Sequence, residues 1–252
     1  MSSPLKFIRP RNLNESRILS WFSQKNAHYT VANARIPGLN VGFNSDENQD
    51  IILEQLHVLA KETDTSLKHI AIAQQIHSDH VKVVTKGGIF PDTDAFVSST
   101  LGISLLIQVA DCGAVLLGDA TNQVIGVAHA GWRGAQKGIV RKTVESMLEL
   151  GAEISSIEAY ISPCISVDAF EVGQEVADLF PEQFVEKNKN TKPHVDLKGY
   201  IFGQLVRTGI LKSHIVMDTG CTFNDENDFY SYRREAKKAG RMAAVIKLNE
   251  IG

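Results

Sequence analysis

The chain is poor in cysteine and has no long apolar segment. Its 252 residues include 3 cysteines. They are widely spaced and odd in number, so they do not suggest a disulfide framework, and we interpret them as reduced thiols of a cytoplasmic protein. The first residues, from Met1 to Lys6, lack the apolar core of a secretory signal. No apolar run approaches the roughly 18 residues that a membrane helix needs. We therefore expect neither secretion nor a membrane partner.

An excess of basic charge is also missing. Lysine and arginine number 26 against 29 aspartates and glutamates, which gives a formal net charge of −3. This balance argues against a general nucleic-acid-binding protein. Hydrophobic residues (43%) and charged residues (22%) occur in proportions ordinary for a globular protein, and the length suffices for a sizeable core. With no repeat or linker in the sequence, we predict one domain over residues 1–252.

Short strands and helices interleave along the chain. Apolar residues at helical spacing predict a helix over residues 50–61, and the apolar run at 101–110 is typical of a buried strand. Further strands are expected at 70–76, 81–84, 157–161, 215–217 and 244–246, further helices at 135–150, 168–180, 197–211 and 234–242, and a loop at 187–190. Residues 1–28 show little pattern. Because one pair of runs forms a hairpin, described next, we predict a mixed sheet with helices on its faces.

Two apolar runs on either side of residues 119–122 have the pattern of a β-hairpin. A symmetric turn at that position places Cys112 opposite His129, and opposed residues of a hairpin have Cβ atoms about 5 Å apart. A third ligand-type residue, His77, follows the strand expected at 70–76. Catalytic zinc sites commonly use three His, Cys or carboxylate ligands and leave the fourth position for water. The alternative is that one or more of these residues is only packed in the core.

Two further motifs carry positive charge. Gly131-Trp132-Arg133-Gly134 opens the helix expected at 135–150, where free N–H groups and Arg133 favour a phosphate or carboxylate. Ser231-Tyr232-Arg233-Arg234 and Arg241 form a second cluster, suited to clamping a phosphate or stacking on a base. Asp111 precedes the thiol and would hold a ligand histidine, relay a proton or simply start the hairpin. A plain glycine turn and a solvated basic helix face are the alternatives for the two motifs.

Taken in order, these strings resemble a known family. The segments Gln75-Ile76-His77, Ala110-Asp111-Cys112, His129 to Gly134 and Ser231 to Arg234 are similar in sequence and separation to the YfiH-like family. Members have been described both as multicopper polyphenol oxidoreductase laccases and as purine nucleoside phosphorylases. Weaker matches begin at Leu39, Asp94, Phe170 and Ala239, so the resemblance spans roughly residues 38–246.

The resemblance implies an α+β fold, a single layered domain with mixed sheets flanked by helices as a four-layer sandwich. It implies zinc, with copper as the alternative, on His77, Cys112 and His129. The implied reactions are phosphorolysis of adenosine, inosine and methylthioadenosine and deamination of adenosine, so the expected partners are a nucleoside and phosphate. Oligomeric state is left open. The site residues expected on this basis are Asp111, Cys112, Arg133 and Glu171 in catalysis, and Asn40, Arg133, Arg233 and Arg241 in substrate or phosphate binding.

The chain departs from the family pattern near its N-terminus. The usual Thr-Arg-x-Gly-Gly-Val-Ser is replaced by a stretch that runs from Tyr29 to Arg35. Ser78, Gly113 and Ser162 stand where the family has glycine, proline and glycine. If the missing arginine contacts substrate in the family, Arg35 is the candidate to replace it here.

Three other functions fit the same residues. Cys112 would serve as the nucleophile of a hydrolase or deamidase, with His129 as its base and Asp111 or another group orienting that base. A copper polyphenol oxidase would need more histidines than the 8 present, none of which forms a His-x-His pair. A non-enzymatic module would close a structural zinc site with a fourth protein ligand, for which Cys164 and Cys221 are the spare candidates.

Overall fold

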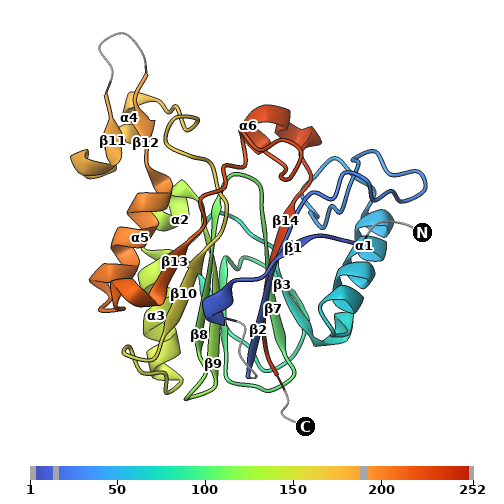
Figure 1. Cartoon of the computed structure of the whole chain (residues 1–252), viewed down its shortest axis with the longest axis horizontal. Coiled ribbons are helices and arrows are strands. Elements are labelled where there is room, and N and C mark those ends of the chain that lie inside the picture. The colour runs from blue at the N-terminus through green and yellow to red at the C-terminus, as the bar shows by residue number, and fades with distance from the viewer. Residues whose placement is uncertain (1–3, 14–16, 188–191, 250–252) are drawn as a thin grey trace.

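Two mixed β-sheets lie face to face in the computed structural model, which describes residues 4–13, 17–187 and 192–249 (Figure 1). Within these residues, sheet A consists, in spatial order, of β1 (Phe7–Ile8), β2 (Ile18–Ser23), β14 (Met242–Leu248), β7 (Ser104–Val109), β3 (Ile70–Ala73) and β5 (Gly88–Phe90). Sheet B consists of β13 (Ile215–Met217), β10 (Glu158–Ile161), β8 (Gly113–Asp119), β9 (Val124–Ala130), β6 (Ala95–Ser98) and β4 (Val81–Val83). A small ribbon pairs β11 (Val185–Glu186) with β12 (His194–Val195).

Helices cover the outer faces of both sheets (Figure 1). The helices of the described residues are α1 (Gln49–Glu62), α2 (Trp132–Gln136), α3 (Ile139–Glu149), α4 (Gln174–Ala177), α5 (Leu197–Arg207) and α6 (Tyr232–Glu235). α1 packs on sheet A, whereas α3 and α5 pack on sheet B. The order is therefore helix, sheet, sheet, helix, and the α+β four-layer sandwich expected from the resemblance is confirmed.

Buried hydrophobic side chains form three cores, because successive side chains along a strand point to opposite faces of the sheet. In β8, Ala114 and Leu116 point to the space between the sheets, whereas Val115 and Leu117 point to the helices of sheet B. A third core lies under α1, where Ile52, Leu56 and Leu59 pack against sheet A. Because β7, β8, β9 and β14 are buried on both faces, their sequences are apolar almost throughout.

The predicted hairpin exists, but its predicted register is wrong. Asp119 pairs with Val124 and Ala114 pairs with His129, so the turn lies at residues 120–123. The carboxylate of Asp119 accepts hydrogen bonds from the backbone and side chain of Asn122, which keeps Asp119 in the strand. Cys112 lies just before β8. The register differs by two residues, and since side chains alternate, a shift of two leaves each side chain on its expected face.

Two predicted helices are mostly wrong. Of residues 168–180 only Gln174–Ala177 is α-helical, because Val172 donates to Pro193 and Glu171 bridges to His194 in extended chain. The basic helix expected at 234–242 is α-helical only up to Glu235. Ala236 adopts φ 51°, a 3-10 helix follows over Ala236–Lys238, and the chain then enters β14. The helix expected at 135–150 is interrupted by Gly138 at φ 84°, which separates α2 from α3.

Several other elements match with shifted ends. The correspondence is as follows: 50–61 with α1, 70–76 with β3, 81–84 with β4, 101–110 with β7, 157–161 with β10, 197–211 with α5 and 244–246 with β14. The strand expected at 215–217 matches β13 at both ends. The weakly patterned N-terminus contains β1 and β2, which the sequence did not predict. The loop expected at 187–190 lies, after Lys187, outside the described residues. No helix in the described ranges has both the length and the apolarity to span a bilayer. The single domain over 1–252 stays a prediction.

Candidate active site

His77, Cys112 and His129 meet at one end of the sandwich. One ligand-type atom from each of them lies within 4.8 Å of those from the other two. The rings of His77 and His129 pack edge to face with centroids 4.8 Å apart. This is the one group of three or more ligand-type side chains among the described residues, and it could hold a metal ion. Neither Cys164 nor Cys221 belongs to it, so within these residues no fourth ligand closes the coordination sphere.

A buried carboxylate that the sequence argument overlooked orients this group. Asp94 has no exposed surface, and its Oδ1 accepts a hydrogen bond of 2.7 Å from Nδ1 of His129. Since Nδ1 is engaged, Nε2 is left to face the thiol and a metal, as in metal sites where a carboxylate holds the far nitrogen of a ligand histidine. Asp94 also accepts from the backbone of Ile76, His77 and Ser78 and from the Ser78 hydroxyl. One side chain thus fixes two ligands.

Sheet pairing explains how Asp94 reaches its partner. Ala95 of β6 pairs with Ala128 of β9, so Asp94 precedes β6 directly beside His129, whose N–H donates to the Asp94 carbonyl at 2.8 Å. A sequence signal was present: Asp94 is a lone acid between a turn and an apolar strand. The signal was too weak because its partner lies 35 residues further along the chain.

The backbone next to the ligands is unusual. His77 adopts φ 59° and Asp111 adopts φ 79°, left-handed conformations that are uncommon for residues other than glycine. Gly131 lies against the group: a Cβ on it would approach Cys112 Sγ to 2.8 Å and His77 Cδ2 to 3.3 Å. A side chain at 131 would therefore displace two of the three ligands.

The electrostatics favour a thiolate. Burial alone raises the pKa of the Cys112 thiol, but the charge of His129 and hydrogen bonds to His129 and His77 outweigh burial and lower the pKa to about 6. Burial lowers the pKa of His129, yet the charge of Cys112 and hydrogen bonds to Asp94 and Cys112 raise it to about 9. Burial likewise opposes ionisation of Asp94, but its bonds to His129 and Ser78 hold the pKa of that carboxyl well below its usual range.

The three ligands open into a cavity of about 700 Å³. Four cationic side chains line it against two carboxylates: Arg133, Arg233, Lys237 and Arg241 against Asp46 and Asp111. Each of the three arginines lies over an aromatic ring that also lines the cavity. The distances from guanidinium to ring centroid are 4.2 Å (Arg133 and Trp132), 5.6 Å (Arg233 and Phe170) and 5.7 Å (Arg241 and Tyr232). The excess of positive charge suits an anion, and the rings suit a flat apolar group.

Asp111 lines the cavity and is held from two sides. Its Oδ1 accepts from the Thr222 hydroxyl at 2.7 Å and its Oδ2 accepts from the Arg233 N–H at 2.6 Å, at the start of α6. Its carbonyl accepts from Ile165. The residue therefore joins three chain segments at the cavity wall.

The arginines differ in how far they are already bound. The side chain of Arg133 forms no hydrogen bond or ion pair within the described residues, and the residue is exposed at the start of α2. Arg233 donates to the Glu171 carbonyl, and the buried Arg241 donates to the carbonyls of residues 239 and 240. Burial lowers the pKa of Arg241. Arg234, from the same predicted cluster, is turned away and donates to Thr222, Phe223 and Phe229.

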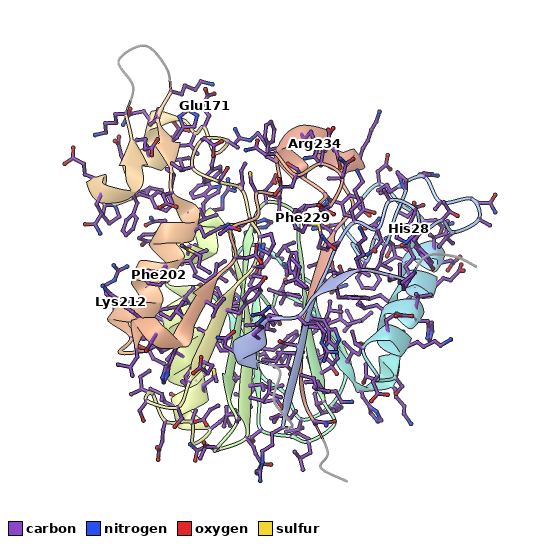
Figure 2. All side chains as sticks on the ribbon, viewed as in Figure 1. His28, Glu171, Phe202, Lys212, Phe229 and Arg234 are labelled. Carbon is purple, nitrogen blue, oxygen red and sulfur yellow. The ribbon has the colours of Figure 1, made fainter. Side chains whose placement is uncertain are left out.

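Two predicted site residues do not line the cavity. The Glu171 side chain forms an ion pair with Lys192 at 3.5 Å, near the β11–β12 ribbon (Figure 2), and only its carbonyl reaches Arg233. Asn40 is fully buried, and its Oδ1 accepts from the backbone N–H groups of Gly42 and Arg241. Asn40 thus acts on the cavity indirectly, through the backbone of Arg241 and through the Ser45 hydroxyl, which accepts from the Asn40 amide at 2.9 Å and lines the cavity.

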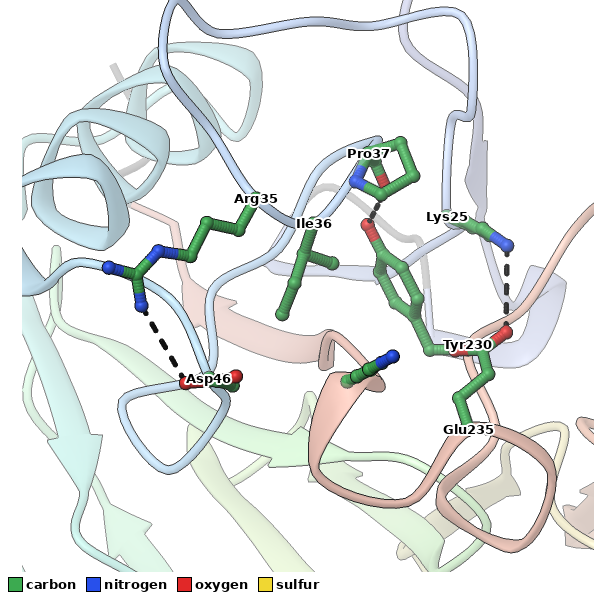
Figure 3. Close-up of a pocket in the computed structure, with 8 residues that line it drawn as sticks. Lys25, Arg35, Ile36, Pro37, Asp46, Tyr230 and Glu235 are labelled. Carbon is green, nitrogen blue, oxygen red and sulfur yellow. Dashed lines mark hydrogen bonds and ion pairs between the residues drawn. The ribbon is translucent and has the colours of Figure 1, made fainter.

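Arg35 does not line the cavity either. It borders a neighbouring hollow of about 410 Å³, where its guanidinium lies 3.7 Å from Asp46 (Figure 3). Tyr230, Lys25 and Glu235 form the opposite wall of that hollow. Asp46 borders both hollows, so Arg35 contacts one residue of the large cavity without lining that cavity itself.

Comparison with known proteins agrees with this geometry. A family model described as multi-copper polyphenol oxidoreductase laccase matches residues 21–249. Purine nucleoside phosphorylase of Deinococcus radiodurans is 37% identical over 216 residues, which are 84% of this chain and 82% of that protein. Adenosine deaminase RL5, from an unknown prokaryotic organism, is 30% identical over 207 residues, covering 75% of this chain and 79% of that protein.

A solved structure has the same fold. Bacillus licheniformis hypothetical protein YfiH superimposes with a TM-score of 0.86 at 25% sequence identity, over 92% of this chain and 93% of that one. The range matched by the family model includes all three residues of the His77, Cys112 and His129 group. The two relatives just described are named as purine nucleoside enzymes. The chain therefore belongs to the YfiH-like family.

Proposed function

We propose that this chain is a zinc-dependent enzyme of purine nucleosides. The proposed reactions are phosphorolysis of adenosine, inosine and methylthioadenosine and hydrolytic deamination of adenosine. One observation carries the proposal: the His77, Cys112 and His129 group opens into the same cavity as three arginines. The names of the relatives from D. radiodurans and of RL5 support the class of substrate.

The donor set suits zinc. Two imidazoles and a thiolate are common zinc ligands, and three protein ligands with an open position are typical of catalytic sites. Copper remains the alternative, because N and S ligands bind it at least as tightly. A zinc ion in such a site supplies Lewis-acid activation of water or of the leaving group. Asp94 keeps the His129 ring in the orientation that a metal needs, with Nδ1 donating to the carboxylate and Nε2 facing Cys112.

For phosphorolysis, the arginines would bind the phosphate that attacks the sugar carbon. Arg133 keeps all its donors available, and the bound Arg233 and Arg241 retain donors beyond those they use on carbonyls. Fixed guanidinium groups stabilise the charge of phosphate without having to reorganise during the reaction. The rings of Phe170 and Tyr232 lie beside Arg233 and Arg241 and would flank the flat purine.

For deamination, a carboxylate must move a proton between water and the purine. Asp111 is the proposed carrier because its carboxylate lines the cavity. Each of its oxygens accepts one hydrogen bond, of 2.7 Å and 2.6 Å, and keeps a second lone pair for a proton. Glu171, the other predicted carboxylate, is directed at Lys192 and would act only through its carbonyl bond to Arg233.

Metal analysis combined with a nucleoside panel tests the proposal. We expect about one zinc per chain, since the described part of the chain holds a single group of candidate ligands. We also expect phosphate-dependent release of base from adenosine, inosine and methylthioadenosine. Adenosine should also yield inosine without phosphate. Protein that retains zinc but releases no base from any of the three, with or without phosphate, would contradict the proposal.

A cysteine hydrolase is the second candidate, because one observation favours it. Cys112, His129 and Asp94 are arranged as a thiolate, its base and a carboxylate that orients the base, and the pKa of the thiol is lowered to about 6. Asp94, not Asp111, has the orienting role. Zinc would occupy the thiolate and inhibit such an enzyme, so activity that survives complete chelation would favour it over the metal-dependent proposal.

The two remaining alternatives have less support. Dioxygen uptake with a phenol in copper-loaded protein would be needed for a polyphenol oxidase. A purely structural zinc needs a fourth ligand, yet Cys164 and Cys221 lie outside the group, and Cys221 accepts from the Ser166 hydroxyl at 2.9 Å. Burial raises the pKa of the Cys164 thiol to about 12, which opposes the thiolate that a metal binds.

A further inference from the structure

One glutamine on the cavity wall has a side chain that no other described residue binds. Gln108, near the end of β7, is 7% exposed and lines the cavity together with Ala110. Its amide nitrogen is buried and has no hydrogen-bond partner, and no bond to its amide oxygen exists within the described residues. Buried amides are almost always bonded, so an unbonded one beside a ligand site calls for a partner that enters from the cavity.

The backbone that carries this side chain is held firmly. Gln75 uses both ends of its own amide on the Gln108 peptide: its Oε1 accepts from the Gln108 N–H at 2.7 Å, and its Nε2 donates to the Gln108 carbonyl at 2.8 Å. On the other side, Gln108 pairs with Ala243 of β14. Both ends of the Gln75 amide are therefore bonded, although Gln75 also lines the cavity, and of the two glutamines that line it Gln108 is the one whose amide has no bond within the described residues.

An amide without a protein partner has no preferred end. A glutamine presents an acceptor at its oxygen and a donor at its nitrogen, and the two ends have nearly the same shape. Where a protein group binds one end, the other end is fixed as donor or acceptor. At Gln108 no group of the described residues does so, and rotation of the amide by half a turn exchanges its oxygen and nitrogen without breaking a hydrogen bond to them.

This freedom matches the difference between the proposed substrates. Adenosine carries an amino group at purine C6, which donates, whereas inosine carries an oxo group there, which accepts. We propose that Gln108 is the residue that binds the substituent at C6, with its oxygen toward a 6-amino purine and its nitrogen toward a 6-oxo purine. The inference rests on the proposed function and extends it, because it explains how one cavity accepts both classes of nucleoside.

The test compares three ribosides in the zinc-loaded, full-length protein with phosphate: adenosine, inosine and purine riboside, which carries only hydrogen at C6. The variant Gln108→Met keeps the length of the side chain and removes both polar ends. We expect kcat/KM for adenosine and for inosine each to fall about tenfold or more, because each loses a hydrogen bond, with little change for purine riboside.

The matched control is Gln204→Met. Gln204 is similarly buried at 8% exposure, its amide donates to Ala135, and it does not line the cavity. That control should leave the ratios among the three ribosides unchanged.

The outcomes separate the two proposals. If Gln108→Met slows all three ribosides by one common factor, Gln108 does not bind the C6 substituent, although the proposed function stands. If the wild-type protein releases base from none of them, the proposed function fails and this inference fails with it. Should the variant not fold, inhibition of the wild type by free bases decides: adenine and hypoxanthine should each bind about tenfold or more tightly than unsubstituted purine. Equal binding of all three bases would overturn the inference.

Discussion

Replacing Asp94 with asparagine should lower the stability of the protein and weaken the candidate metal site. The carboxylate accepts five hydrogen bonds, two at Oδ1 and three at Oδ2. Asparagine keeps one oxygen and places an NH₂ group at the other position, so at least two buried donors face a donor. With each orphaned donor costing about 1–3 kcal/mol, the free energy of unfolding should fall by about 2–6 kcal/mol.

The same change should lower the affinity for zinc. His129 loses the carboxylate that fixes its ring, and His77 loses the acceptor of its backbone N–H. Loss of such a support typically weakens metal binding by about 10–100-fold. Competition with a chromogenic chelator measures the zinc affinity, and urea unfolding with and without zinc measures the stability.

Asp119→Asn is the matched control for this prediction. Asp119 is equally buried and accepts three hydrogen bonds, from the backbone and side chain of Asn122 and from Glu153, but it lies at the opposite end of β8. This variant should lose stability and keep its affinity for zinc. The reasoning fails if Asp94→Asn binds zinc within about twofold of the wild type, or if both variants lose affinity equally, given the loss expected for a ligand support.

Three further predictions concern the same site. In metal-free protein, alkylation of Cys112 by iodoacetamide should rise as pH increases through about 6, because a depressed pKa makes the thiolate available above that value. Arg133→Ala should raise the KM for phosphate about tenfold, since its unbound guanidinium is the donor set most available to an anion, while zinc affinity is unchanged. Gly131→Ala should lose zinc, because the added Cβ would stand 2.8 Å from Cys112 Sγ, and its metal content by atomic absorption should fall accordingly.

Each of these predictions has its own control. Cys164 should stay unlabelled below pH 9, because burial raises the pKa of its thiol to about 12. Arg141→Ala removes an exposed arginine that pairs with Glu145 on α3 and should not alter phosphate binding. Gly151→Ala introduces a residue at φ 97° with no neighbour of the new Cβ within 4 Å, so it costs stability without touching the ligands. A labelling midpoint near pH 9 for Cys112, an unchanged phosphate KM or a fully loaded Gly131→Ala protein would each refute the corresponding argument.

Local pattern was sufficient to predict which three ligand-type side chains would meet, but not the geometry that brings them together. The hairpin placed Cys112 and His129 on one face, and a register error of two residues did no harm because side chains alternate with period two. An error of one residue would have separated them. His77 was identified from its residue type and its position after a strand, yet its contact with His129 depends on sheet A packing against sheet B, which no local pattern encodes.

Long-range pairing explains what was missed. Asp94 acts on His129 because β6 lies beside β9, and this pairing joins segments about 30 residues apart. Glu171 and Asn40 were chosen for their place in a family string, but the orientation of a side chain depends on neighbours such as Lys192 and Gly42 that the string does not specify. The basic helix expected at 234–242 failed for a similar reason. A Cβ on Gly240 would lie 2.6 Å from the Tyr230 ring, so close packing and the start of β14 outweigh local helical spacing.

The number of histidines that could bind a metal can be compared with the description of the family as multi-copper. A multicopper centre needs several sets of histidine ligands, and this chain has 8 histidines, all within the described residues. Only His77 and His129 belong to a group of three or more ligand-type side chains there, and the third member is a thiol. Others are engaged elsewhere: His80 contacts the carbonyl of Asp92, and His214 lies 3.6 Å from Glu158. Within the described residues the ligand-type side chains therefore suit one ion rather than several, and they lie beside the three arginines of the proposed phosphate site.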